Sequence, residues 1–160
     1  MVILTNSQKR YRIAERRLKR QARQILEQLD VAEAELSILL VNNPRMRELN
    51  REHRGIPKTT DVLSFPLHEL EEGGDLDFAG QPVLLGDVVL CLERIDRQAR
   101  ERAWDFEDEL IFCLVHGVLH LLGFDHEAND EDARKMYARQ AEIFAKLRPN
   151  TRYESFIEFE

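Results

Sequence analysis

The sequence predicts an α+β fold in which a small mixed β-sheet of about four strands packs against about five helices. Segments rich in Val, Ile and Leu, which are typical of strands, lie in the first part of the chain, with helical patterns between some of them. Helical spacing of apolar residues dominates the second part. The length of 160 residues suits one domain with one core, so we expect residues 1–160 to form a single domain.

Four segments have the composition of strands: residues 2–5, 35–41, 60–65 and 83–92. Pro66 ends the third segment, because proline cannot donate a hydrogen bond to a strand ladder. Residues 67–82 are rich in acids and glycine and are expected to form a surface loop. Gly86, inside the fourth segment, indicates a β-bulge or a close approach of another backbone.

Five segments are predicted helices: residues 8–29, 43–53, 93–103, 105–122, and a last helix that Asn129 caps and Pro149 ends. Asn43 followed by Pro44 is typical of a helix N-cap and first turn. The segment 105–122 is apolar on nearly all sides, which predicts a central buried helix. Gly123 is expected to end it.

The net charge of −7 argues at first against a nucleic-acid partner, which favours a basic protein. The charge is uneven, however. Residues 1–30 contain eight Lys and Arg against three Asp and Glu, a net charge of +5, so the remainder carries −12. Two further arginine-rich stretches lie at residues 45–58 and 94–102, and residues 67–77 are acidic. A basic surface is therefore compatible with the overall acidity.

The two cysteines, Cys91 and Cys113, each lie inside an apolar run, so we expect two reduced core residues and no disulfide. The N-terminal sequence lacks the order of charged and apolar regions found in a signal peptide. No stretch approaches the roughly 18 apolar residues of a membrane span. A cytoplasmic protein without a membrane partner is the expectation.

Three histidines fall within eleven residues, in the segment HGVLHLLGFDH. His116 and His120 are four residues apart on the predicted central helix, so their rings share one face and can bind one metal. Gly123 allows a left-handed turn that can bring His126 back toward the same point. Two imidazoles in a buried helix need polar partners, and a shared metal supplies them. Three histidines with an open position are typical of a catalytic zinc site.

Two alternatives depend on neighbouring residues. The spacing of the histidines is also that of metzincin proteases, but these place the general-base Glu directly after the first histidine, where this chain has Gly117. A metzincin-like zinc hydrolase is therefore the weaker hypothesis. A non-catalytic, zinc-containing assembly factor would need a fourth protein ligand, for which Cys113 is the candidate. Asp125 could orient a ligand or cap the turn, and the sequence favours neither.

The motif HGVLHLLGFDH resembles the HGxLHLxGxDH signature of the YbeY-type endoribonucleases. A second stretch, with Leu49-Asn50, Arg54 and then TDVLSFP at residues 60–66, is similar to that family's LN…YR…PTDVLSFP. The segment Leu85-Gly86-Asp87 is similar to its LGDI strand. The order and spacing of these motifs match from about residue 36 to residue 147.

The resemblance implies a metal-dependent, single-strand-specific endoribonuclease that acts in ribosomal-RNA maturation, at the 3′ end of the small-subunit RNA, and in ribosome quality control. It implies His116, His120 and His126 as ligands of one Zn²⁺, with His116 and Arg54 as catalytic residues. The implied partners are single-stranded or ribosomal RNA and the ribosome or its proteins, and not DNA. The chemistry agrees, because the arginine fork and a metal both stabilise charge on phosphate oxygens. Other divalent transition metals also suit three imidazoles.

Three further polar residues in these motifs, Ser64, Asp61 and Asp87, are expected to be mostly structural. Asp61 would cap a turn, and Asp87 would accompany the strand bulge. The residues favour neither a metal-bound water nor the RNA 2′-hydroxyl as the nucleophile.

Overall fold

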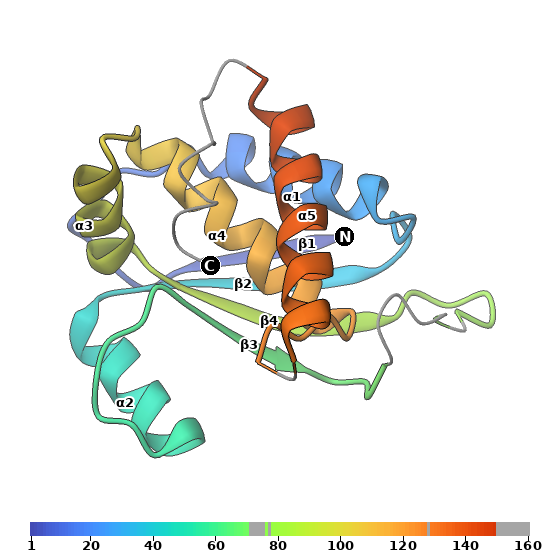
Figure 1. Cartoon of the computed structure of the whole chain (residues 1–160), viewed down its shortest axis with the longest axis horizontal. Coiled ribbons are helices and arrows are strands. Elements are labelled where there is room, and N and C mark those ends of the chain that lie inside the picture. The colour runs from blue at the N-terminus through green and yellow to red at the C-terminus, as the bar shows by residue number, and fades with distance from the viewer. Residues whose placement is uncertain (71–75, 77, 128, 150–160) are drawn as a thin grey trace.

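The computed structural model contains four strands and five helices in its described residues, which are 1–70, 76, 78–127 and 129–149 (Figure 1). In chain order the elements are β1 (Val2–Asn6), α1 (Glu15–Gln28), β2 (Glu35–Val41), α2 (Asn43–Arg54), β3 (Val62–Pro66), β4 (Leu84–Cys91), α3 (Leu92–Arg102), α4 (Phe106–Leu121) and α5 (Asp130–Leu147). The strand order in the sheet is β1-β2-β4-β3. The pairs β1–β2 and β2–β4 are parallel, and β3 pairs antiparallel with β4. The predicted α+β class and mixed sheet are confirmed.

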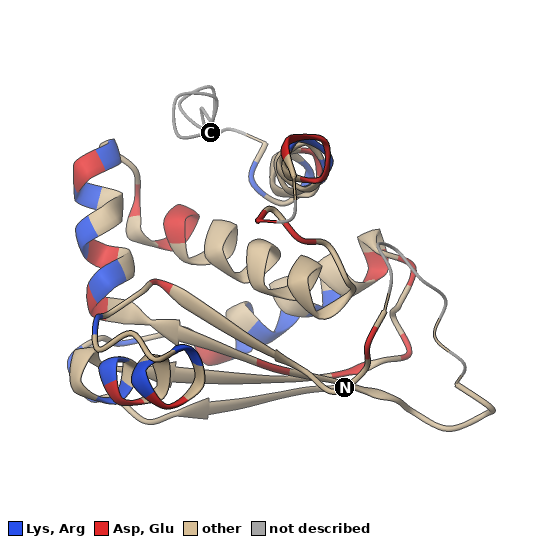
Figure 2. Ribbon diagram, turned by 60° about the horizontal axis from the view of Figure 1, so that its bottom comes forward, with Lys and Arg blue, Asp and Glu red and all other residues tan. Residues whose placement is uncertain are grey.

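The sheet separates two apolar clusters, because neighbouring residues of a strand point to opposite faces. Most of the core lies between the sheet and helices α1, α4 and α5; β4 contributes Val88 and Leu90 to it. Figure 2 shows α4 lying across the sheet with α5 above it. On the other face, Val89 and Cys91 of β4 pack against Met46 of α2. The helix α4, which carries two of the three histidines, is therefore buried between the sheet and α5, as its composition predicts.

The predicted helix over residues 8–29 is wrong over residues 8–14, because α1 begins only at Glu15. The buried side chain of Gln8 folds back onto the chain: its Oε1 accepts from the backbone N–H of Tyr11, and its Nε2 donates to the Tyr11 carbonyl. The Tyr11 hydroxyl donates to Asp96 of α3, and the Tyr11 ring stacks on Phe106 of α4. The local bonds of Gln8 and the tertiary contacts of Tyr11 replace the helical hydrogen bonds that the apolar spacing alone would favour.

The other element boundaries differ from the predicted ones by one or two residues. Asn42 is the N-cap of α2 in place of Asn43, and its side chain accepts from the backbone N–H of Arg45. Asn129 caps α5 as predicted. Both cysteines are free and buried, which confirms that prediction. Of the acidic loop, residues 71–75 and 77 lie outside the described residues, as do residues 150–160. No helix in the described part of the chain is long and apolar enough to cross a membrane.

Two glycines allow the layers of the fold to approach closely. Gly86 has φ +143°, and a Cβ atom there would overlap the Phe65 carbonyl oxygen. The register between β2 and β4 also shifts next to it, which confirms a bulge with close backbone contact. At Gly117 of α4, a Cβ atom would lie 2.7 Å from Cγ1 of Val88 and 3.0 Å from Cγ2 of Val62. Because α4 rests directly on β3 and β4, its histidines are held at a fixed position beside β3, whose residues line the same cavity.

Candidate metal centre

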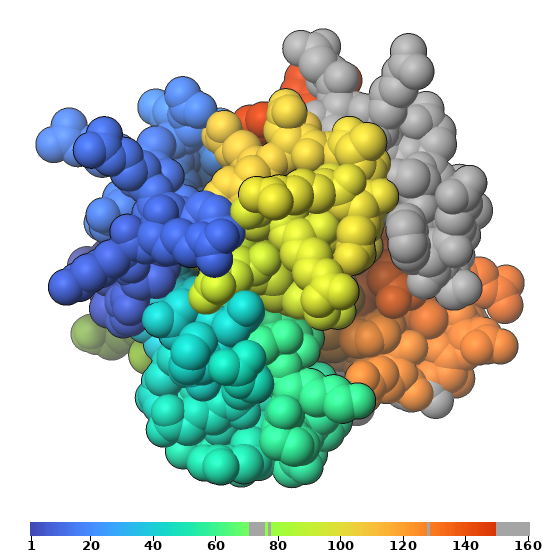
Figure 3. Space-filling model, turned by 90° about the vertical axis from the view of Figure 1, so that its left-hand side faces the viewer, coloured from blue at the N-terminus to red at the C-terminus, as the bar shows by residue number. Residues whose placement is uncertain are grey.

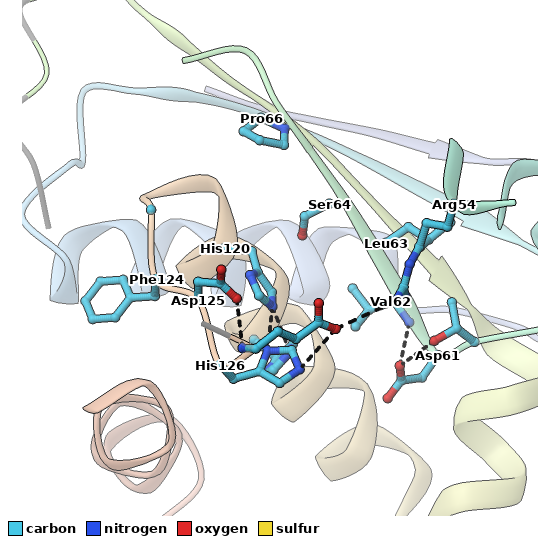
Figure 4. Close-up of a pocket in the computed structure, with 14 residues that line it drawn as sticks. Arg54, Asp61, Val62, Leu63, Ser64, Pro66, His120, Phe124, Asp125 and His126 are labelled. Atoms are coloured by element: carbon cyan, nitrogen blue, oxygen red, sulfur yellow. Dashed lines mark hydrogen bonds and ion pairs between the residues drawn. The ribbon is translucent and has the colours of Figure 1, made fainter. Parts of the chain in front are cut away.

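The three predicted histidines meet at one point. His116 and His120 project from the last turns of α4, and His126 follows the turn at Gly123, whose φ is +91°. The His116 and His120 Nε2 atoms lie 3.2 Å apart, and Nδ1 of His126 lies 3.1 Å from the His120 Nε2. Figure 4 shows His120 and His126 directed toward each other across the turn. These residues form a group of potential metal ligands, with one ligand atom from each residue within 4.8 Å of the others.

The geometry of this group fits a bound metal. A tetrahedral Zn²⁺ with Zn–N bonds of about 2.0–2.1 Å holds its ligand nitrogens about 3.3 Å apart. The observed separations of 3.2 and 3.1 Å are close to this value. Three ring nitrogens that face one another at hydrogen-bonding distance need either a shared proton or a shared cation. A divalent ion satisfies all three lone pairs together.

A buried glutamine orients the first histidine. Nδ1 of His116 donates to Oε1 of Gln140 on α5 at 3.1 Å, and the Gln140 Nε2 donates to the carbonyl of Phe112 at 3.2 Å. The proton of His116 is therefore on Nδ1, and its Nε2 lone pair faces the other two histidines. Such a hydrogen bond to the nitrogen opposite the metal is the usual support of a metal-binding histidine. No motif in the sequence points to Gln140 as the partner of this histidine.

Burial keeps the imidazoles of His116 and His120 in the form that binds metals. Burial lowers the pKa of His116. It also lowers the pKa of His120 to about 4, with the neighbouring His116 and His126 contributing in the same direction. A neutral imidazole has a free lone pair at neutral pH, which is the requirement for coordination.

Arg54 faces the histidines across an open cavity of about 460 Å³. It is the last residue of α2, a helix that packs on the opposite face of the sheet, and its side chain passes the edge strand β3 toward the histidines (Figure 4). Arg54 Nη2 lies 3.7 Å from Oε1 of Glu127 in the loop after α4. The structure thus brings together the four site residues proposed from the sequence, together with Glu127, which the sequence analysis did not single out.

The polar residues around the cavity have structural partners. Ser64 Oγ donates to the Gly117 carbonyl at 2.8 Å, which ties β3 to α4. Asp61 Oδ1 accepts from the backbone N–H of Val62, and its Oδ2 accepts from Gln98. Asp125 caps the turn, since its Oδ1 accepts from the backbone N–H of Glu127 at 2.8 Å. This contact favours the capping role that the sequence left open for Asp125.

The structure also weakens both alternative hypotheses. Position 117 faces β3 and β4 with no room for a side chain, so it cannot supply the general-base carboxylate of a metzincin. Met136, which falls where a metzincin methionine would, is fully buried in the core. Cys113 is directed elsewhere: its Sγ donates to Asp61 Oδ2 at 3.5 Å, and burial raises its pKa well above the usual value. It is not a member of the histidine group, so it does not close the site as a fourth ligand.

Comparison with known proteins assigns the family. The family model described as Endoribonuclease YbeY matches residues 3–148. A relative from Syntrophotalea carbinolica named Endoribonuclease YbeY is 44% identical over 149 residues, covering 92% of this chain and 96% of its own. One of the same name from Geobacter sulfurreducens is 40% identical over 147 residues, with coverages of 91% and 95%.

The fold is shared with a solved structure as well. The solution structure of TM1509 from Thermotoga maritima superposes with a TM-score of 0.63 at 26% sequence identity, covering 95% of this chain and all of the other. A family model that spans nearly the whole chain, and relatives of similar length and high identity, identify this chain as a member of the endoribonuclease YbeY family, whose activity is the cleavage of RNA phosphodiester bonds.

Proposed function

We propose that this protein is a zinc-dependent endoribonuclease that cleaves single-stranded RNA and acts in the maturation of ribosomal RNA, at the 3′ end of the small-subunit RNA and in ribosome quality control. The observation that carries the proposal is the position of Arg54 opposite His116, His120 and His126 across one cavity. A cation site and a guanidinium on opposite walls are what binding of a phosphodiester requires.

Each wall of the cavity has a distinct part in the chemistry. Cleavage of a phosphodiester builds negative charge on the non-bridging oxygens. The metal, when bound, supplies Lewis-acid stabilisation of that charge. Arg54 donates N–H groups to the same phosphate and orients it, because the planar guanidinium can bind two oxygens together. His116 is held in one tautomer by Gln140, so the ligand geometry does not have to reorganise during the reaction.

The size of the cavity favours an unpaired strand. A volume of about 460 Å³ is in the range of pockets that take a small molecule, so it can receive one nucleotide of an extended chain but not the width of a duplex. Proteins that act on RNA in this way take unstacked nucleotides from single-stranded regions.

The surface beside the cavity is only moderately basic. Figure 3 shows the N-terminal segment, α2 and α3 side by side on one face of the molecule. Arginines gather there, but several are paired with acids of the same helix, as in Arg97–Glu101 and Arg100–Asp96. Figure 2 shows the same alternation of charges along α2 and α3. Because exposed pairs of this kind leave little free positive charge, we expect weak binding to bare RNA and a contribution from the ribosome or a ribosomal protein to substrate choice.

The test compares cleavage of a single-stranded ribosomal-RNA fragment, and zinc content, among the wild type and three variants. His116→Ala should lose both the metal and the activity. Arg54→Ala should keep its zinc and fold and lose about 100-fold to 1,000-fold in turnover, the usual effect of removing one group that stabilises transition-state charge. Arg97→Ala is the matched control, because its exposed side chain lies outside the cavity, and it should cleave normally.

Unchanged zinc in His116→Ala would refute the ligand assignment, and unchanged cleavage by Arg54→Ala would remove Arg54 from the mechanism. Hydrolysis of an unfolded protein such as casein, without cleavage of RNA, would favour the metzincin-like alternative.

A further inference from the structure

The carboxylate of Glu127 lies between Arg54 and the histidine group. Its Oε1 atom is 3.7 Å from Nη2 of Arg54 and 3.9 Å from Nε2 of His126. Glu127 lines the same cavity as these two residues. One negatively charged oxygen therefore lies against the guanidinium that is proposed to bind the substrate phosphate, and beside the His126 nitrogen other than Nδ1, the atom that faces His120.

Glu127 differs from the other two carboxylates that line the cavity. Asp61 and Asp125 both accept hydrogen bonds from backbone N–H groups and are fixed by them. The backbone of Glu127 is fixed, because the Glu127 N–H donates to Asp125 at 2.8 Å. The Glu127 side chain, by contrast, is 67% exposed. The carboxylate is thus attached to a fixed point through a flexible stem.

The contact between Glu127 and Arg54 is of the kind that a ligand displaces easily. Both side chains are largely exposed, with 45% of the Arg54 side chain accessible, and the 3.7 Å separation is longer than a charge-assisted hydrogen bond. A phosphate group can accept hydrogen bonds from two nitrogens of the guanidinium, and its negative charge is also attracted to a bound metal ion. It therefore competes effectively with a single carboxylate oxygen.

We propose that Glu127 is an internal competitor of the substrate phosphate: its carboxylate occupies the anion position between Arg54 and His126 when no RNA is bound, and RNA displaces it on binding. This inference rests on the proposed role of Arg54. It makes Glu127 a residue that sets the apparent affinity for RNA and leaves the chemical step unchanged. The carboxylate also disfavours weak, non-productive binding of other anions at the site.

The experiment measures KM and kcat of the zinc-loaded enzyme on a short single-stranded RNA. Glu127→Gln should lower KM by about 2-fold to 5-fold, the range that corresponds to losing one exposed ion pair, with kcat and zinc content unchanged. Glu131→Gln is the matched control, because this acid lies in the first turn of α5, is 79% exposed and pairs with Lys135. It removes the same charge four residues away and should leave KM unchanged.

A second comparison isolates the contact itself. In an Arg54→Ala background the Glu127→Gln substitution should no longer lower KM, because the partner of the carboxylate is absent. An equal fall in KM for Glu127→Gln and Glu131→Gln would overturn the inference in favour of a general electrostatic effect. A loss of kcat at constant KM would overturn it in favour of a role in proton transfer.

The two proposals fail in different ways. If Arg54→Ala is impaired but Glu127→Gln has wild-type KM, the competitor role is wrong and the proposed site stands. If Arg54→Ala cleaves RNA as the wild type does, the proposed site itself is wrong.

Discussion

The substitution Gln140→Leu tests whether the hydrogen bond between α5 and His116 controls metal affinity. Gln140 is 1% exposed and makes two hydrogen bonds, one from His116 Nδ1 at 3.1 Å and one to the Phe112 carbonyl at 3.2 Å. Leucine has a similar volume but no polar atoms. The variant therefore leaves the buried Nδ1–H of His116 unpaired, removes one hydrogen bond to the Phe112 carbonyl, and frees the His116 ring to change tautomer.

Two magnitudes follow from these contacts. Loss of a partner to a metal-ligating histidine weakens metal binding about 10-fold to 100-fold, so the zinc dissociation constant should rise by that factor. The unpaired N–H and the lost hydrogen bond should together lower the free energy of unfolding of the metal-free protein by about 2–4 kcal/mol. Zinc affinity is measured by competition with a coloured chelator, and stability by urea denaturation. Gln140→Glu keeps an acceptor for His116 Nδ1 and should retain more of the zinc affinity than Gln140→Leu.

The control is Gln98→Leu. Gln98 of α3 is half-buried and donates to Asp61 and Glu109, so the variant loses two hydrogen bonds, neither of which involves a histidine. It should lower stability without changing zinc affinity. Wild-type zinc affinity in Gln140→Leu, or an equal loss in Gln98→Leu, would show that the hydrogen bond to His116 does not orient a metal ligand.

Three further predictions concern packing and buried charge. Gly117→Ala should lower the free energy of unfolding by about 1–3 kcal/mol in urea denaturation, because its Cβ would lie 2.7 Å from Cγ1 of Val88; wild-type stability would mean that α4 is not held against β4. Gly86→Ala should cost about 3 kcal/mol or more by the same assay, since it combines strain at φ +143° with overlap of the Phe65 carbonyl, and a smaller loss would contradict the close approach. Burial raises the pKa of Glu109, so the folded state binds the proton of that carboxyl more tightly than the unfolded chain does. The stability of the wild type relative to Glu109→Gln should therefore be greatest below about pH 4.5 and fall as pH rises; a difference that is constant or grows with pH would refute this.

Most elements could be predicted because their signals are local. The strand 35–41 and the helix 105–122 follow from composition and periodicity over a few residues, and the structure agrees within one or two positions. The segment 8–14 could not be predicted in this way. Its apolar spacing continues that of α1, but the Gln8 side chain bonds to the Tyr11 backbone and the Tyr11 hydroxyl makes a tertiary contact with Asp96, and these contacts replace the helix. The periodicity indicates which face of a segment is apolar, but it does not indicate which other elements pack against that face.

The sequence by itself determined the metal-binding pattern of this protein. Two histidines four residues apart must share a face of a helix, and a glycine after the helix allows the turn that returns His126, so these ligands follow from short-range geometry. Only the tertiary structure decided what surrounds them. Arg54 of α2 and Glu127 of the loop after α4 meet at one cavity, and Gln140 of α5 supports His116 from outside that cavity. Both arrangements depend on how these elements pack about the sheet. Distances between elements far apart in the chain are set by the packing of the whole core, and no local pattern in one sequence records them.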